Sequence, residues 1–267
     1  MFMVCSSSMR TTRATSPVFE RRVLVALLLA CTPAILGFVA ASADQPLLAQ
    51  APPQRTDERP ENPPKAAEPV ERLGPNLLRV GNVQVDTSAK EISVRGTVND
   101  VQNLEFLANT KDGFKAYESA LELDTNAINF NLGLILIGLD SAHAVVPRRQ
   151  FDPELPRGDP VEIWIEWGES GSRRRIRAEQ LVQDRITKEL LTEGPWVYTG
   201  SVFTRERGAY LADIDGTLIG FMHTPSPILE NPRPLPGVFG NFIINPELNL
   251  KAGTSVLVTV RALTRAK

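Results

Sequence analysis

Two aspartates late in the chain make the strongest match to a catalytic motif. Asp213 and Asp215 stand in the run Asp-Ile-Asp-Gly-Thr-Leu after an apolar stretch. Phosphatases that use an aspartate nucleophile and a second aspartate as general acid present them in this order. Such enzymes also need a later lysine and an acidic pair for phosphate and Mg²⁺, yet the 49 residues after Leu218 contain no aspartate. The pattern therefore favours an Asp-Gly hairpin turn between two strands.

A second pair of acids, Glu162 and Glu166, flanks Trp164 on one face of a predicted strand. Two catalytic carboxylates beside a sugar-stacking ring would look like this in a glycosidase. Four residues at ~3.3 Å each separate them by about 13 Å, whereas glycosidase carboxylates lie roughly 5 to 9.5 Å apart. We expect these acids to balance nearby arginines, with Arg175 over Trp164 in a cation–π contact.

The remaining groups that could do chemistry are isolated. His143 and His223 are the only histidines, and neither has a second His or a Cys at metal-ligand spacing. The Gly-x-Ser-x-Gly pattern of serine hydrolases does not occur. We therefore assign no catalytic residue, metal ligand or cofactor. Trp196 and Tyr198 lie on one face of a predicted strand, which indicates sheet packing or a ligand platform.

The first 43 residues have the pattern of a signal peptide. Arg21 and Arg22 precede an apolar run from Val23 that ends at Ala41-Ser-Ala43. We expect cleavage after Ala43, which makes the protein exported: periplasmic, on the cell surface or secreted. Two alternatives remain open, because the apolar run is long enough for an uncleaved membrane anchor and Cys31 lies in a lipoprotein-like box.

Both cysteines, Cys5 and Cys31, lie in this segment, so a cleaved chain has no thiol and no disulfide. The residues after 43 carry 25 basic and 30 acidic groups. Nucleic acid is not an expected partner, because duplex binders carry a clustered basic excess.

Residues 44–75 contain eight prolines and almost no aromatic or β-branched residues. Such a segment cannot bury enough apolar surface to offset its ordering entropy, so we expect a disordered Pro-rich linker. The folded domain should span residues 76–264. A cysteine-free exported domain of this size must be stabilised by its hydrophobic core, which favours a well-packed sheet.

The domain is expected to be α+β, mainly antiparallel β-sheet with one buried helix at about 126–139. That helix is apolar on all faces, and Asp124-Thr125 would cap it. Alternating patterns and turn residues predict strands at Leu78–Val85, Glu91–Val98, Asn103–Ala108, Val161–Trp167, Ser172–Arg177, Trp196–Phe203, Ala209–Asp213, Thr217–Met222, Asn241–Ile244 and Ser255–Ala262.

The hairpin of Val161–Trp167 and Ser172–Arg177 has a predictable register. Placing Ile163 opposite Ile176 on the buried face leaves a four-residue loop. The exposed face then pairs Glu162 with Arg177, Trp164 with Arg175, and Glu166 with Arg173.

Five segments together resemble the YdjY domain family of bacterial exported proteins. They are Lys115–Ser119, the helix end Leu134–Gly138, Val161–Trp167, Arg175–Val182 and Gly194–Ser201, of which the last, Gly-Pro-Trp-Val-Tyr-Thr-Gly-Ser, is the most specific. The resemblance covers about residues 78–260. It implies a fold more than an activity, since members of the family are essentially uncharacterised.

Some relatives in this family are described as ferredoxin-like iron–sulfur proteins. Such clusters need cysteine thiolates, which the cleaved chain does not have, so the resemblance does not extend to an iron–sulfur cluster. The family pattern also implies a His before the Glu where this chain has Tyr117 and Glu118. Glu118 is therefore the residue of that pair that could still act in a family site.

These observations predict a non-catalytic envelope module that binds a protein or envelope ligand. Its contact surface would involve Trp164, Trp196, Tyr198 and Glu118, and the N-terminal segment could tether it to a membrane. One alternative is an envelope hydrolase that uses Asp213, Asp215, Glu118 or His143 in a shared cleft. Another is a purely structural envelope component.

Overall fold

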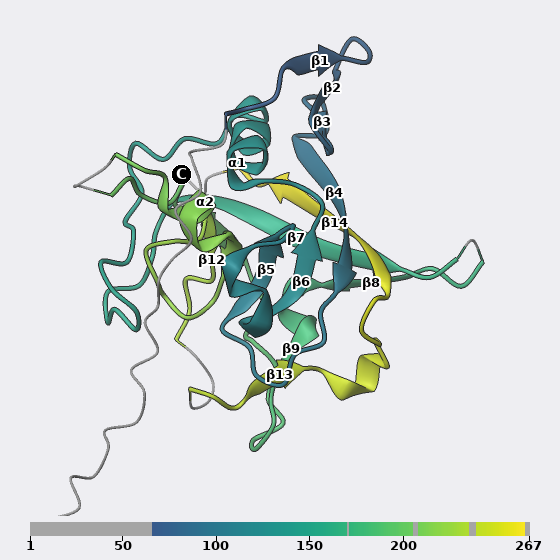
Figure 1. Ribbon diagram of the computed structural model, residues 1–267, viewed down its shortest axis with the longest axis vertical. Coiled ribbons are helices and arrows are strands. Elements are labelled where there is room, and N and C mark those ends of the chain that lie inside the picture. Colours follow the sequence, from purple (N-terminus) through teal and green to yellow (C-terminus); the bar gives the residue numbers. More distant parts are fainter. Residues whose placement is uncertain (1–65, 170, 205–207, 235–238, 265–267) are drawn as a thin grey trace, which may run out of the picture. The chain divides into compact units, whose positions relative to one another are not determined.

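The computed structural model describes residues 66–169, 171–204, 208–234 and 239–264 (Figure 1). The predicted signal peptide and the linker up to residue 65 lie outside these ranges. The strands are β1 (Val70–Arg72), β2 (Leu77–Val80), β3 (Val83–Asp86), β4 (Glu91–Val98), β5 (Phe106–Thr110), β6 (Ser119–Leu123), β7 (Asp159–Trp167), β8 (Arg174–Arg177), β9 (Val182–Asp184), β10 (Trp196–Tyr198), β11 (Thr217–Gly220), β12 (Leu229–Glu230), β13 (Phe242–Ile244) and β14 (Ser255–Ala262).

Helical structure is short by comparison. The described part contains the α-helices α1 (Ala127–Leu136) and α2 (Leu211–Asp215), and the 3₁₀ turns η1 (Phe114–Glu118), η2 (Ala178–Leu181) and η3 (Pro246–Leu248). The expectation of a mainly β domain is confirmed. Among the described residues, no helix has the length and apolar character needed to cross a bilayer.

The main sheet closes on itself in a barrel-like ring. Strands β4, β14, β7, β10, β12, β11, β5 and β6 pair in this order, and β6 pairs back with β4. Most pairs are antiparallel, as predicted, but β5–β6 and β11–β12 are parallel. The long strands β4 and β7 each share one edge between two partners, which lets β1–β3 and β8 extend outside the ring. Figure 1 shows the β7–β8 hairpin reaching beyond the other strands.

The ring closes at a position where only glycine fits. Gly96 of β4 pairs with Leu123 of β6, and a Cβ atom on Gly96 would lie 2.3 Å from the backbone oxygen of Glu122. A side chain at this position would push the two strands apart. Inside the ring, alternating residues of β7 such as Ile163 and Ile165 are fully buried in one continuous core.

Helix α1 differs from the prediction in length, cap and burial. It begins after Asn126, whose side chain accepts a hydrogen bond from the backbone N–H of Asn129, so Asp124-Thr125 is not the cap. It packs against β2, β3 and β4, and Figure 1 shows it beside these strands. One face of the helix meets solvent, where Ile135 is 49% exposed, so the helix is not buried on all sides.

Several predicted strands have different bounds or a different structure. Leu78–Val85 is split into β2 and β3 by a tight turn that begins at Gly81. Ala209–Asp213 was predicted as a strand, but it lies largely in α2. Gly216 ends this helix in the left-handed conformation at φ 69°, so Asp-Gly forms a helix C-cap and not a hairpin turn.

The predicted register of the β7–β8 hairpin is wrong by two residues. Ile165, not Ile163, lies opposite Ile176, and Trp164 lies opposite Arg177. A shift by two keeps every side chain on its predicted face. The longer loop allows a turn in which the N–H of Ser172 donates to the backbone oxygen of Glu169.

Replacing Gly96 with alanine should destabilise the domain by at least about 2 kcal/mol, because the new Cβ meets a backbone atom that cannot move alone. Gly74→Ala is the matched control, since a Cβ there meets nothing closer than 3.7 Å. Urea unfolding of both variants measures the difference. Equal stability of the two variants would show that the closure tolerates a side chain.

Glu230 of β12 is fully buried, and burial raises the pKa of its carboxyl to about 8. The N–H of Thr224 donates to its Oε1 at 3.1 Å. Between pH 4.5 and about 8, the folded chain keeps a proton that the unfolded chain has released. Stability from this group is therefore present at low pH and is lost as the pH rises through this window.

The free energy of unfolding of the wild type should fall relative to Glu230→Gln between pH 5 and 8, by up to about 1.4 kcal/mol per pH unit. Glutamine keeps the shape and the acceptor but cannot ionise. Urea titrations at several pH values check this, with the exposed Glu189→Gln as control. Parallel pH profiles for wild type and Glu230→Gln would contradict the prediction.

Candidate ligand-binding site

The structure does not bring the predicted aromatic residues together on one surface. Trp196 and Tyr198 face the core with Val161, and their side chains are 0% and 1% exposed. The phenol of Tyr198 donates to Asn131 of α1 at 2.8 Å, and burial raises its pKa to about 12. Trp164 lies on the opposite face of the sheet. Trp196 and Tyr198 are therefore packing residues, which agrees with the sheet-packing interpretation of the sequence and not with the ligand platform.

The outward face of β7 and β8 is occupied by its own charge pairs. The guanidinium of Arg175 lies 4.4 Å from the centre of the Trp164 ring, which confirms the predicted cation–π contact. Glu162 pairs with Arg177 at 2.7 Å, and Glu166 pairs with Arg175 at 3.2 Å. With its charges paired within the hairpin, this face offers little for a charged ligand.

Glu118 lies in a different environment, at the end of η1. This turn lies where the chain crosses from β5 to β6. The Glu118 carboxylate forms an ion pair with the ammonium of Lys115 at 2.6 Å. The same ammonium lies 5.7 Å from the ring centre of Phe114 and 5.5 Å from that of Tyr117. Burial opposes the charge of Lys115, but its contacts with Glu118 and Tyr117 raise its pKa overall.

A cavity of about 450 Å³ opens beside Glu118. Its walls combine three carboxylates with two exposed aromatic rings and come from the loop before β5, from η1 and from the segment before β13. The lining residues are Asp100, Val101, Gln102, Asn103, Leu104, Glu105, Tyr117, Glu118, Phe239 and Gly240. We call this space the Glu105 cavity.

Glu105 is the titrating group of this cavity. Burial and the neighbouring charge of Glu118 raise its pKa to about 7, while Lys115 and a hydrogen bond from Gln150 work against the rise. The Gln150 amide donates to Glu105 Oε2 at 2.9 Å. A carboxyl that is half protonated near neutral pH can bind a cation or transfer a proton.

The parallel pairing of β5 and β6 explains why the two acids meet. Phe106 pairs with Ser119 at the start of both strands, so the residues before them, Glu105 and Glu118, are neighbours at one edge of the sheet. The backbone N–H of Glu105 donates to the backbone oxygen of Glu118 at 2.8 Å. Sequence reasoning missed Glu105 because β6 was not predicted. The family segment that begins at Lys115 was the signal that pointed to this place.

The other predicted acid and base positions lie elsewhere. Neither Asp213 nor Asp215 lines the Glu105 cavity, and both belong to α2, where Asp215 is buried. His143 is exposed in the loop after α1. Within the described ranges, no three His, Cys, Asp or Glu side chains are grouped as a metal site would require.

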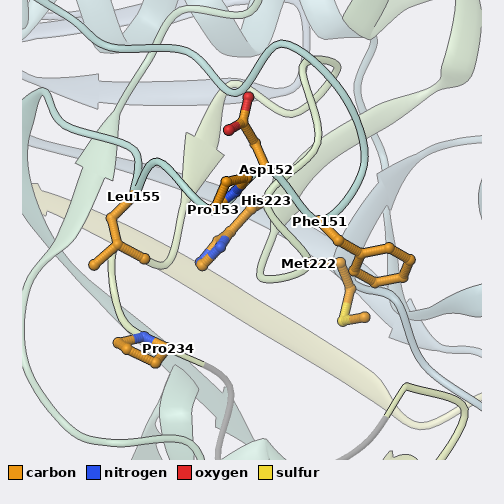
Figure 2. A pocket seen from close by; sticks show the side chains of 7 residues that line it. All are labelled: Phe151, Asp152, Pro153, Leu155, Met222, His223 and Pro234. Carbon is orange, nitrogen blue, oxygen red and sulfur yellow. The ribbon is translucent and has the colours of Figure 1, made fainter.

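A second, more apolar cavity of about 350 Å³ surrounds His223, and we call it the His223 pocket. Figure 2 shows the imidazole ring between two groups of side chains, Phe151 with Met222 and Leu155 with Pro234, while the Asp152 carboxylate points away. Pro153 completes the lining.

The imidazole of His223 is held by backbone carbonyls. Its Nε2 contacts the backbone oxygens of Asn231 and Arg233 at 3.0 and 3.1 Å, so this nitrogen carries the proton. Burial lowers the pKa of this ring, which favours the neutral form. His223 therefore fixes the loop that forms one wall of the pocket.

Searches of curated proteins and of solved structures found no match to this chain. A family model, that of the YdjY domain, matches residues 83–261, from β3 to β14. The match includes the whole closed ring, the Glu105 cavity and the His223 pocket. Because it covers well over half of the chain, the protein belongs to the YdjY domain family.

Proposed function

We propose that this chain is an exported envelope protein whose YdjY domain is a binding module. The basic and apolar pattern of residues 1–43 supports export, and the Pro-rich composition from residue 44 up to β1 supports a linker between the N-terminal segment and the domain. Mass spectrometry of the mature N-terminus tests this part: Asp44 as first residue supports release, a lipidated Cys31 supports anchoring, and an intact Arg21 segment supports a membrane helix.

The observation that carries the binding proposal is the Glu105 cavity, which joins carboxylates to aromatic walls. Lys115 already neutralises Glu118, and burial keeps Glu105 partly protonated. A ligand ammonium would restore the charge balance of Glu105, and an attached apolar group would contact Tyr117 and Phe239. The ligand class that fits is therefore a cation with an apolar neighbour. This replaces the Trp164 and Trp196 surface expected from sequence.

Benzylamine is a small probe with both features. In ¹H–¹⁵N correlation spectra, it should shift the backbone resonances of Glu105, Glu118 and Gly240 in a saturable way, because its ammonium and ring fit the cavity. Benzyl alcohol and benzoate are matched controls that remove or reverse the charge, and they should produce no saturable shifts there. Equal shifts from all three probes, or none from benzylamine, would contradict the proposed ligand class.

Affinity for benzylamine should rise about tenfold from pH 6 to pH 8, because the probe stays protonated while Glu105 ionises around its pKa of about 7. Glu105→Gln should bind weakly with a flat profile across this range. Glu154→Gln, an exposed acid outside the cavity lining, should keep the wild-type profile. Isothermal titration at three pH values measures the effect, and a flat wild-type profile would rule out Glu105 as the titrating contact.

An envelope hydrolase is the second candidate, and one observation favours it. The environments of Glu105 and Glu118 differ, since one carboxyl has a raised pKa and the other is paired with Lys115, as acid and base partners often do. A panel of chromogenic esters and glycosides tests this. Turnover that is lost in both Glu105→Gln and Glu118→Gln would support an enzyme, and no turnover above background would favour the binding module.

A further inference from the structure

Exposed apolar side chains gather around the two cavities. Ten large apolar or aromatic side chains are exposed in the described ranges, and four of them line the Glu105 cavity or the His223 pocket. These four are Tyr117, Phe151, Leu155 and Phe239. Soluble proteins rarely leave such side chains together at the surface unless the surface contacts something.

The two cavities adjoin each other. Phe151 lines the His223 pocket and Phe239 lines the Glu105 cavity, and their rings meet edge to face with centres 5.0 Å apart. Gln150, the residue before Phe151, donates to the carboxylate of Glu105. One loop therefore contributes to both sites, and a pair of aromatic rings forms the boundary between them.

We propose that the Glu105 cavity and the His223 pocket are two subsites of one groove, which binds an extended polypeptide segment carrying a basic side chain near an apolar one. The basic group occupies the Glu105 cavity and the apolar side chain occupies the His223 pocket. This inference rests on the proposed function for the first subsite, and it adds the second subsite and the class of ligand.

Charge and shape favour a polypeptide over other ligands. The carboxylates of Asp100 and Glu105 in the cavity lining disfavour the phosphates of nucleic acids and of anionic lipids. A single small amine leaves the His223 pocket empty. An extended chain presents separate side chains along one backbone, which matches two chemically different subsites on either side of the Phe151–Phe239 boundary.

The test uses peptides with acetylated and amidated ends that contain one lysine and one leucine, separated by zero to three glycines. One spacing should bind best, because the two subsites have fixed positions. In that peptide, serine in place of leucine should weaken binding about tenfold, and glutamate in place of lysine should abolish it. Fluorescence anisotropy with labelled peptides measures these affinities.

Matched protein variants locate each subsite. Leu155→Ser should weaken binding of the leucine peptide about tenfold and leave the affinity for the serine peptide unchanged. Ile186→Ser is the control, because Ile186 is also exposed but lies outside both cavities. Circular dichroism and melting temperatures confirm that both variants are folded.

The outcomes separate this inference from the proposed function. Benzylamine binding with no preference for leucine at any spacing would overturn the groove and leave the Glu105 cavity as a simple cation site. Failure of both benzylamine and the lysine peptides would overturn the two proposals together. Loss of leucine preference in Leu155→Ser but not in Ile186→Ser would support the two-subsite groove.

Discussion

The closed sheet depends on the close backbone approach between β4 and β6 at Gly96. This contact joins the ends of a strand order that would otherwise leave two open edges, and an unpaired strand edge is a site for unwanted association. Closure also determines where the connections lie. Asn99, just after β4, donates its amide to Asn109 of β5 and to the backbone oxygen of Ser119. These bonds hold the η1 crossing against the ring.

The neighbouring pairing of β5 with β6 brings together the acids of the Glu105 cavity. Parallel neighbours begin at the same edge of a sheet, so β5 and β6 place Glu105 and Glu118 side by side although 13 positions separate them. One lysine serves these two carboxylates, and the unbalanced acid has the raised pKa. The β7–β8 face is the opposite case, because alternating acids and arginines along two paired strands neutralise each other. The incompletely paired charge therefore lies in the Glu105 cavity, not on the face where charged residues are most numerous.

Buried polar groups also order the loops around β12. Glu230 is fully buried and accepts a hydrogen bond from a backbone N–H of the loop between β11 and β12. His223, in that same loop, contacts the backbone oxygens of Asn231 and Arg233. Both groups order the walls of the His223 pocket by satisfying backbone groups that a loop cannot pair by itself. This gives the His223 pocket a defined shape.

Local patterns in the sequence were sufficient for the mainly antiparallel sheet, the long strands, the family and the Trp164 cation–π contact, because each depends on neighbours within a strand or hairpin. They also indicated Glu118 through a short family segment. The parallel pairing of β5 with β6, the helix at Leu211–Asp215, the two-residue register shift and the burial of Trp196 and Tyr198 were decided by the tertiary structure. These features depend on contacts beyond the local sequence pattern, since the closed ring sets which face of β10 is inside and the β5–β6 pairing sets which acids meet. That is why the sequence pointed to Glu118 but only the fold revealed Glu105 as its partner.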